Sequence, residues 1–260
     1  MRRTAARLAM ACLLAAAASA DASENGAEEV TGTRQASVFV RLEQPDHGLD
    51  AWHAMRVEIA STPGNWQRSW QAAAVSESRF GDRDQGIELG ASLPLDARWL
   101  LQVDASMAPA ATFLPRHSAE MRLVRRFDHG FLATAGIRGA RYRAVRADRA
   151  MLSLERYAGA WRISWTGSLV RVAGAHSPGH ALAVDRYFGD RDSIGLRLSR
   201  DRELVPLADG MRTFARVRSA SLQGRHWLSR RWGVQAAAGY TAQSGLYDRA
   251  WWQLGLMHAW

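Results

Sequence analysis

The last ten residues of the chain, Trp251 to Trp260, constrain its fold more than any other stretch. Every second residue in this stretch belongs to one mostly apolar face, which comprises Trp252, Leu254, Leu256, His258 and Trp260. The residues between them form a mixed face of smaller side chains. Alternation with a period of two predicts a β-strand that has unlike environments on its two sides. Such a strand fits either the edge of a soluble β-domain or the wall of a membrane barrel.

The same alternation recurs along the chain from Ala36 onward, with turn residues such as Pro63-Gly64-Asn65 between the segments. The clearest segments are 86–93 and 99–107, and the least regular is 213–227. We count about 14 segments, most of about nine to twelve residues, which is the length that a tilted strand needs to cross a bilayer. The sequence therefore predicts an all-β fold. We expect a single up-and-down antiparallel transmembrane β-barrel over residues 36–260, with about 14 strands and 12 as the alternative count.

The first residues have the features of an export signal. Arginines at positions 2, 3 and 7 precede an apolar run, and Ala18-Ser19-Ala20 fits a cleavage site. We predict a cleaved signal peptide over residues 1–20 and a flexible periplasmic segment over the polar, acidic residues 21–35. The single cysteine, Cys12, lies in the signal, so the mature chain has no thiolate metal site. No later run reaches 18 apolar residues, so we expect the chain to enter the outer membrane of a Gram-negative bacterium as a barrel.

The basic residues of this chain argue against nucleic acid as a partner. All 34 basic residues are arginine, and the formal net charge is +9. These arginines are scattered singly through the predicted strands, without a basic cluster, a zinc spacing or a nucleic-acid motif. We therefore expect no nucleic-acid partner and no cofactor.

The terminal strand also predicts the orientation of the barrel. If residue 260 ends in the periplasm, counting back places the longer connections 108–116, 173–179, 202–210 and 242–247 on the outer side. Most of the tryptophans then lie beside the short turns on the periplasmic side, as an aromatic belt at the membrane interface requires. This predicted periplasmic girdle comprises Trp66, Trp99, Trp161, Trp227, Trp232 and Trp260.

The face opposite the apolar one carries charges of both signs. The residues expected to point into the lumen are Arg56, Glu58, Glu88, Asp104, Glu120, Arg122, Arg126, Arg138, Glu155, Arg162, Asp185 and Arg197. Mixed charges on neighbouring strands favour ion pairs that fill the interior. The alternative is a polar path for an anionic or sugar substrate, with the arginines as hydrogen-bond donors. A barrel of about 12 to 14 strands lies between the small filled barrels and the open porins, so we expect a narrow or occluded lumen.

One motif occurs twice, as Phe80-Gly81-Asp82-Arg83-Asp84 and as Phe188-Gly189-Asp190-Arg191-Asp192. Gly-Asp pairs are suited to hairpin turns, which is the favoured explanation for both copies. A calcium role for their aspartates is a weaker alternative. Since seven predicted strands separate the two copies, we expect them on opposite rims.

Three stretches of the sequence resemble the YaiO family of outer-membrane barrels. They are Arg79-Phe80-Gly81, the run 185–196 and the run 198–203, within a resemblance that extends over about residues 36–260. The resemblance implies an outer-membrane location and an association with envelope glycan machinery, and it transfers no catalytic residues. The terminal strand resembles the C-terminal signal that the barrel assembly machinery recognises. The partners we expect are therefore the outer-membrane bilayer with its lipopolysaccharide, the assembly machinery, and envelope glycan export components.

The sequence offers little support for an enzyme. His117-Ser118 and His176-Ser177 are adjacent pairs, and adjacent side chains of a strand point to opposite faces. No Gly-x-Ser-x-Gly elbow and no helical metal-binding pair of histidines is present, so we predict no catalytic and no metal site. The favoured function is a narrow pore or accessory component linked to export or assembly of envelope polysaccharide. The alternatives are a non-conducting structural or adhesive barrel, and a lipid- or glycan-modifying barrel enzyme.

Overall fold

The computed structural model describes residues 33–62, 66–189, 191–206 and 212–260. Within them, fourteen antiparallel strands follow one another around a closed barrel, and β1 pairs with β14 to complete it. The strands are β1 (Thr33–Pro45), β2 (Trp52–Thr62), β3 (Ser69–Arg79), β4 (Asp82–Pro94), β5 (Trp99–Met107), β6 (His117–Arg126), β7 (Phe131–Arg141), β8 (Arg146–Ala158), β9 (Trp161–Val172), β10 (Ala175–Phe188), β11 (Asp192–Pro206), β12 (Arg212–Trp227), β13 (Trp232–Gln243) and β14 (Tyr247–Ala259). The prediction of a 14-stranded up-and-down barrel is confirmed, and the alternative count of 12 is wrong.

The predicted signal peptide lies outside the described residues, as does most of the predicted periplasmic segment 21–35. The barrel itself begins at Thr33, three residues before the expected start at Ala36. The one helical element among the described residues is a 3-10 turn, Asp128–Gly130. No helix in these residues is long and apolar enough to cross a membrane.

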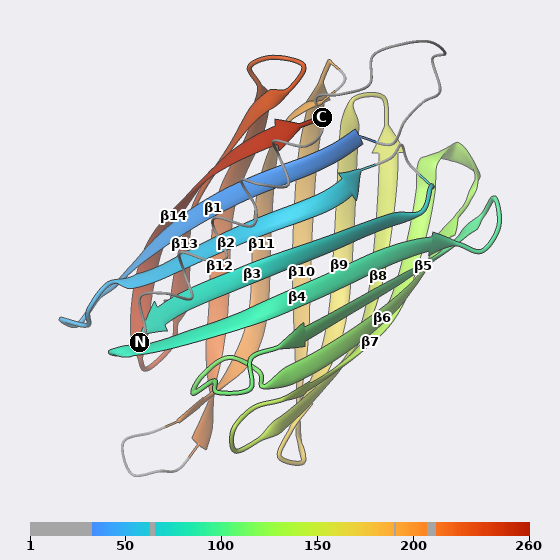
Figure 1. Ribbon diagram of the computed structural model, residues 1–260. Helices are drawn as coiled ribbons and strands as arrows, with labels where there is room; N and C mark the ends of the chain where they lie inside the picture. Colours follow the sequence, from blue (N-terminus) through green and yellow to red (C-terminus); the bar gives the residue numbers. More distant parts are fainter. Residues whose placement is uncertain (1–32, 63–65, 190, 207–211) are drawn as a thin grey trace.

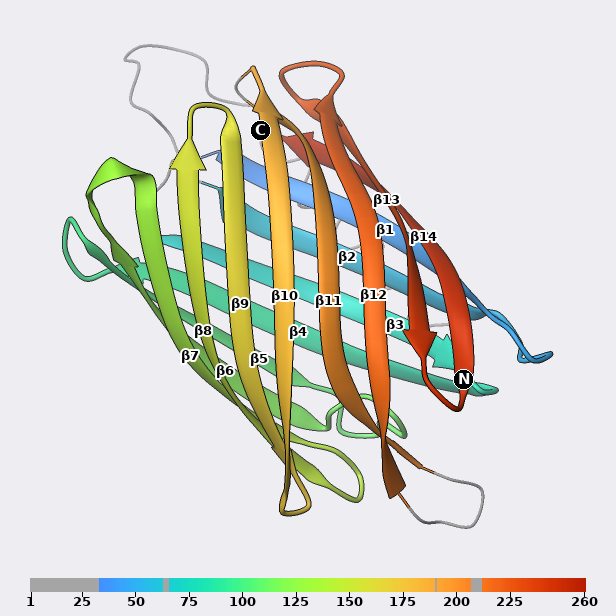
Figure 2. The same ribbon diagram turned by 180° about the vertical axis from the view of Figure 1, so that it is seen from behind.

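The strands differ in slope around the barrel. In Figure 1, β1 to β4 cross the front of the molecule at a strong tilt. In Figure 2, β9 to β12 run more steeply along the opposite wall. The two walls therefore enclose the lumen between strands of unlike slope. The alanine-rich runs 71–74 and 236–238, which have high helix propensity, belong to β3 and β13 because alternation continues through them.

Alternation along β14 gives the barrel wall its two faces. Leu254 and Leu256 point outward and are 53% and 49% exposed, whereas Met257 points inward and is 2% exposed. The outward set continues around the barrel with residues such as Ile137, which is 60% exposed. Large apolar side chains that face outward in every part of the wall require an apolar surrounding, and a bilayer provides it.

The connections lie at two rims. The terminal rim is the one at which β14 ends and β1 begins, and the far rim is the opposite one. The far rim carries the longest fully described connection, 108–116, as the sequence predicted. The predicted loop 173–179 is wrong, because β9 turns into β10 over Ala173-Gly174, both with positive φ (48° and 84°). Pro178 and Gly179 suggested a loop, yet both pair with β9.

Two other predicted outer loops are shorter than expected, because the strands extend into them. β11 continues to Pro206, and β12 starts at Arg212. The described part of the predicted loop 202–210, residues 202–206, is therefore strand. The connection after β13 comprises residues 244–246 instead of 242–247. At the far rim, long strands thus take the place of the predicted long loops. The predicted difference in loop length between the two rims is due mainly to the connection 108–116.

Candidate functional site

The candidate site is the lumen of the barrel, which holds three adjoining cavities of about 350, 170 and 670 Å³. Gln235 of β13 lines both the first and the second cavity. Arg162 and Arg197 line both the second and the third. Because neighbouring cavities share lining residues, they are parts of one polar space that runs around the interior.

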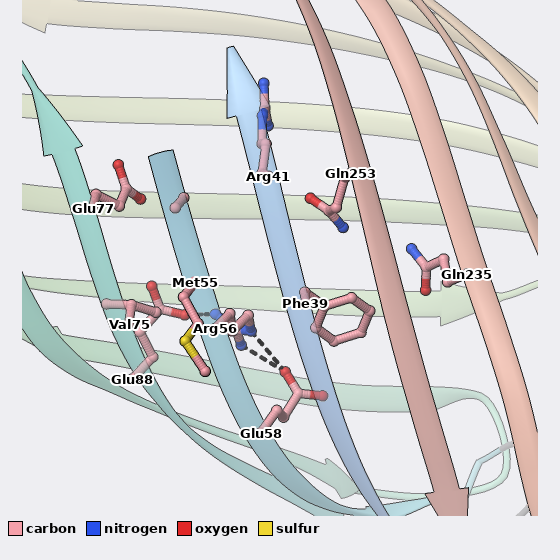
Figure 3. Close-up of a pocket in the computed structure, with 11 residues that line it drawn as sticks. Phe39, Arg41, Met55, Arg56, Glu58, Val75, Glu77, Glu88, Gln235 and Gln253 are labelled. Atoms are coloured by element: carbon pink, nitrogen blue, oxygen red, sulfur yellow. Dashed lines mark hydrogen bonds and ion pairs between the residues drawn. The ribbon is translucent and has the colours of Figure 1, made fainter. Parts of the chain in front are cut away.

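Arg56 is the centre of the first ion-pair cluster, in the smaller of the two large cavities. Its guanidinium donates to Glu58 of the same strand at 2.7 and 2.9 Å, and it also binds Glu88 of β4. Figure 3 shows Arg56 between these two carboxylates, and Gln235 of β13 and Gln253 of β14 line the same cavity. One arginine therefore bridges two carboxylates and ties β2 to β4 across β3.

A second cluster lies on β5, β6 and β7. Arg122 binds Asp104 at 2.5 Å and Glu120 at 3.5 Å, and Arg138 approaches Glu120 at 3.9 Å. Gln71 of β3 donates to Asp104 at 3.5 Å, so the cluster also reaches across β4. The inner positions of these strands place the charges opposite one another in register, since Asp104, Glu120 and Arg138 are direct cross-strand neighbours.

A third cluster joins β8, β9 and β10 through Arg162. Its guanidinium donates to Glu155 at 2.6 Å and to Asp185 at 2.8 Å. The side chains of Arg162, Glu155 and Asp185 are 20%, 15% and 7% exposed, which makes this the most enclosed of the three clusters. The three clusters together lie on the inner face of β2–β10, which we call the charged wall.

The inner face of β11–β13 has a different composition, and we call it the small-residue wall. Much of it consists of short side chains: Ser199, Ala215, Ser219, Ser221, Ala237, Gly239 and Thr241. Arg197 projects from this wall and is exposed. Its cross-strand neighbours on β10 and β12 are Ala183 and Ser221, which are too short to cover it. Among the described residues, no carboxylate forms an ion pair with Arg197.

Two more lumenal arginines near the terminal rim lack an ion pair with any described residue. Arg126 donates to the carbonyl of Ala97, and Arg225 donates to the carbonyl of Arg191. Each backbone bond occupies only part of a guanidinium fork with five N–H donors. Together with Arg197, these arginines give the terminal half of the lumen donors and positive charge that its own carboxylates do not neutralise.

The connection 108–116 is attached to the inner face at the far rim. Asp84, 3% exposed, accepts the backbone N–H groups of Thr112, Phe113 and Leu114 at 2.8–3.0 Å. The ring of Phe113 also lies under the guanidinium of Arg79, 5.3 Å from its Cζ. This loop therefore folds toward the lumen and narrows the mouth of the barrel.

The structure places all twelve predicted lumenal residues at inner-face positions. It brings most of them together in the three clusters, whereas Arg126 and Arg197 stay outside them. Sequence reasoning missed Glu77, which pairs with Arg79 at 2.7 Å, and Glu43, which lies 2.9 Å from both Arg41 and Arg249. Alternation along β1 and β3 could have identified these residues, because they occupy the face of each strand that also points into the lumen.

The predicted girdle divides into two groups. Trp99, Trp161, Trp232 and Trp260 lie at the terminal rim and face outward. Trp66 instead lines the largest cavity under Arg126, whose Cζ is 4.9 Å from the ring centroid. Trp227 occupies an inner-face position opposite Gly233. The nearness of a tryptophan to a turn correctly predicts its rim. Whether it faces the lipid or the lumen depends on its odd or even position in the strand.

The two copies of the Phe-Gly-Asp-Arg-Asp motif lie at opposite rims. The first forms the β3–β4 turn, and the second spans the β10–β11 turn, of which Asp190 lies outside the described residues. Asp192 accepts the N–H of Trp227 at 2.8 Å, much as Asp84 accepts loop N–H groups. In both copies the last aspartate caps backbone, and no group of three or more possible metal ligands occurs among the described residues.

The two histidine–serine pairs do not converge on a reactive centre. Ser118 points inward and exchanges a hydrogen bond with Ser106 at 2.8 Å, whereas His117 points to the other face. Ser177 is fully buried on the inner face, and His176 points outward. In each pair the wall of the barrel therefore separates the hydroxyl from the imidazole.

A closed antiparallel barrel with an apolar outer face and a polar lumen is an outer-membrane β-barrel of the porin-like kind. The model of the YaiO membrane β-barrel domain matches residues 34–200, and the chain belongs to this family. The predicted resemblance is thereby confirmed. No curated protein sequence matches the chain.

Solved structures share the fold at low sequence identity. The KdgM porin in complex with disordered oligogalacturonate is 12% identical, with a TM-score of 0.50 over 86% of this chain and 99% of that one. A bacterial polysaccharide outer membrane secretin is 8% identical, with a TM-score of 0.55 over 89% and 100%. The CymD monoaromatic hydrocarbon channel is 7% identical, with a TM-score of 0.57 over 89% of each chain. These similarities concern the fold.

Proposed function

We propose that this chain is a narrow outer-membrane pore for anionic saccharides of the cell envelope. The observation that carries the proposal is Arg197, an exposed guanidinium between short neighbours in a lumen where most other charges are paired. A planar fork of N–H donors binds carboxylates and phosphates in a bidentate manner. An acidic sugar that enters the terminal half of the lumen meets Arg197, Arg126 and Arg225.

The family and the structural neighbours support this proposal in a general way. Two of the neighbours bear names that concern acidic or polymeric sugars, namely oligogalacturonate and polysaccharide. The cavities around Arg197 have volumes of about 170 and 670 Å³, which suits an extended sugar chain better than a folded macromolecule. An acidic envelope polysaccharide is the substrate class that agrees with both the names of these neighbours and the size of the cavities.

Ion selectivity in planar bilayers tests the proposal. The folded protein should form channels that prefer anions, and Arg197→Gln should move the reversal potential toward zero. Arg200→Gln is the matched control, because Arg200 lies on the same strand and points to the outer face. A uronic-acid oligosaccharide should block the current at lower concentration than a neutral oligosaccharide of equal length.

A non-conducting structural barrel is the second candidate. It is favoured by the three ion-pair clusters that cross the lumen wall and by the loop that Asp84 holds at the mouth. The same bilayer experiment separates the two candidates. A protein that migrates faster unheated than boiled on SDS gels, and so is folded, but opens no channels would refute the pore. Loss of surface polysaccharide after gene deletion would then leave an accessory role in assembly.

A further inference from the structure

A repeated pair of side chains lies on the outer face of the barrel at the terminal rim. In four odd-numbered strands the first residue is aromatic, and an arginine or histidine near the end of the next strand lies directly opposite it. The pairs are Trp99 with Arg125, Phe131 with Arg156, Trp161 with Arg186, and Trp232 with His258. Three of them follow one another over β5–β10, and we call their arginines the arginine arc (Arg125, Arg156, Arg186).

Each guanidinium of the arginine arc packs over aromatic rings. The Cζ of Arg125 lies 5.0 Å from the centroid of Trp99 and 4.8 Å from that of Phe127. The Cζ of Arg156 lies 5.1 Å from Phe131, and that of Arg186 lies 5.4 Å from Trp161 and 4.9 Å from Phe188. Contact with a ring face holds the guanidinium in place and leaves its N–H edge free.

The arginine arc lacks counter-charges of its own. All three side chains are exposed, and none forms an ion pair with a carboxylate of the described residues. The far rim offers a contrast on the same part of the outer face. There Arg146 and Arg171 share Asp148, at 2.9 and 3.1 Å. This pair at the far rim is thus bound to a carboxylate of the barrel, whereas the three guanidinium groups of the arginine arc are not.

Outward aromatic rings beside the turns set the level of this rim in a bilayer. Aromatic belts lie among the lipid headgroups, and long basic side chains extend from the apolar wall toward the same level. The anions available there are the phosphates of the lipids. We propose that the arginine arc binds the headgroups of anionic phospholipids in the leaflet at the terminal rim, with each guanidinium held by its aromatic partner. The orientation predicted from the terminal strand makes this the periplasmic leaflet.

Lipid retention by the purified, folded protein tests the proposal. The protein in detergent is mixed with equimolar phosphatidylglycerol and phosphatidylcholine, and native mass spectrometry counts the lipids that remain bound. The wild type should retain phosphatidylglycerol in preference. Arg156→Gln with Arg186→Gln should lower that preference by about fivefold for each arginine, since one basic side chain near an anionic surface contributes about 1 kcal/mol.

The matched control is Arg146→Gln with Arg171→Gln, which also removes two exposed outward arginines from β8–β10. Because both guanidinium groups of that pair are already bound to Asp148, the control should retain lipids as the wild type does. An equal loss in both double variants, or no loss in either, would overturn the proposal. The single variant Arg125→Gln gives a second measure, with an expected loss of about fivefold. The unheated gel mobility of every variant verifies that the barrel is folded.

Discussion

The charged wall and the small-residue wall face each other across one lumen, yet they are built from unlike residues. On the charged wall, Arg56, Arg122 and Arg162 each bridge two carboxylates. On the small-residue wall many inner positions hold serine, alanine or glycine, and the hydroxyl groups of Ser199 and Ser219 bond to each other at 2.6 Å. Paired charges fix the spacing of strands, whereas short side chains leave room, part of which larger side chains such as Trp251 over Gly239 fill. Under the proposed function, the charged wall braces the barrel and the small-residue wall borders the passage.

A bulky residue on the small-residue wall should have the largest effect. Ser221 lies at an inner position between Arg197 and Gly239, so Ser221→Trp inserts an indole into the space beside the exposed guanidinium. We expect the single-channel current to vanish while the barrel still folds. Ala220→Trp places the same side chain on the outer face one residue away and should leave the current unchanged. Undiminished current through the Ser221 variant would show that passage does not follow this wall.

On the charged wall, removal of one bridging cation should destabilise the barrel. Arg162→Gln leaves the carboxylates of Glu155 and Asp185, 15% and 7% exposed, without their cation. The expected loss in the free energy of unfolding is about 2 kcal/mol, less than for a fully buried pair because the lumen is polar. Urea titration in lipid vesicles measures it.

The control for this variant uses an exposed ion pair. Arg146→Gln removes one of two arginines from Asp148, at a site on the outer face near the far rim. Exposed pairs contribute little to stability, so no measurable change in unfolding is expected. Equal destabilisation by the two variants would mean that loss of any arginine, and not loss of bracing, weakens the barrel.

The sequence predicted most of the fold because a barrel wall imposes one simple rule. Each strand has a lipid face and a lumen face, so alternation, together with the turn residues between segments, predicted about 14 strands and assigned residues such as Arg162 to the interior. Parity does not extend to turns. Ala173-Gly174 adopts positive φ at both residues and closes a tight hairpin, while Pro178 and Gly179, which suggested a loop, lie in a strand.

The candidate site was less accessible from the sequence, because pairing depends on register. Asp104 and Arg122 were both expected in the lumen, but their contact follows from the stagger of β5 against β6. The isolation of Arg197 also depends on its neighbours in space, Ala183 and Ser221, which are far apart in the chain. Asp84 seemed to be a turn residue, whereas its carboxylate caps a loop about thirty residues away.

The smallest effect is expected when both members of the Ser199–Ser219 pair on the small-residue wall are replaced together. Ser199→Ala with Ser219→Ala removes donor and acceptor at once, so no buried group is left without a partner. The free energy of unfolding should change by less than about 0.5 kcal/mol, and the single-channel current should stay as in the wild type. The same urea titration and bilayer recording apply. A loss as large as that of Arg162→Gln would mean that this wall also braces the barrel, and the division of labour between the two walls would be wrong.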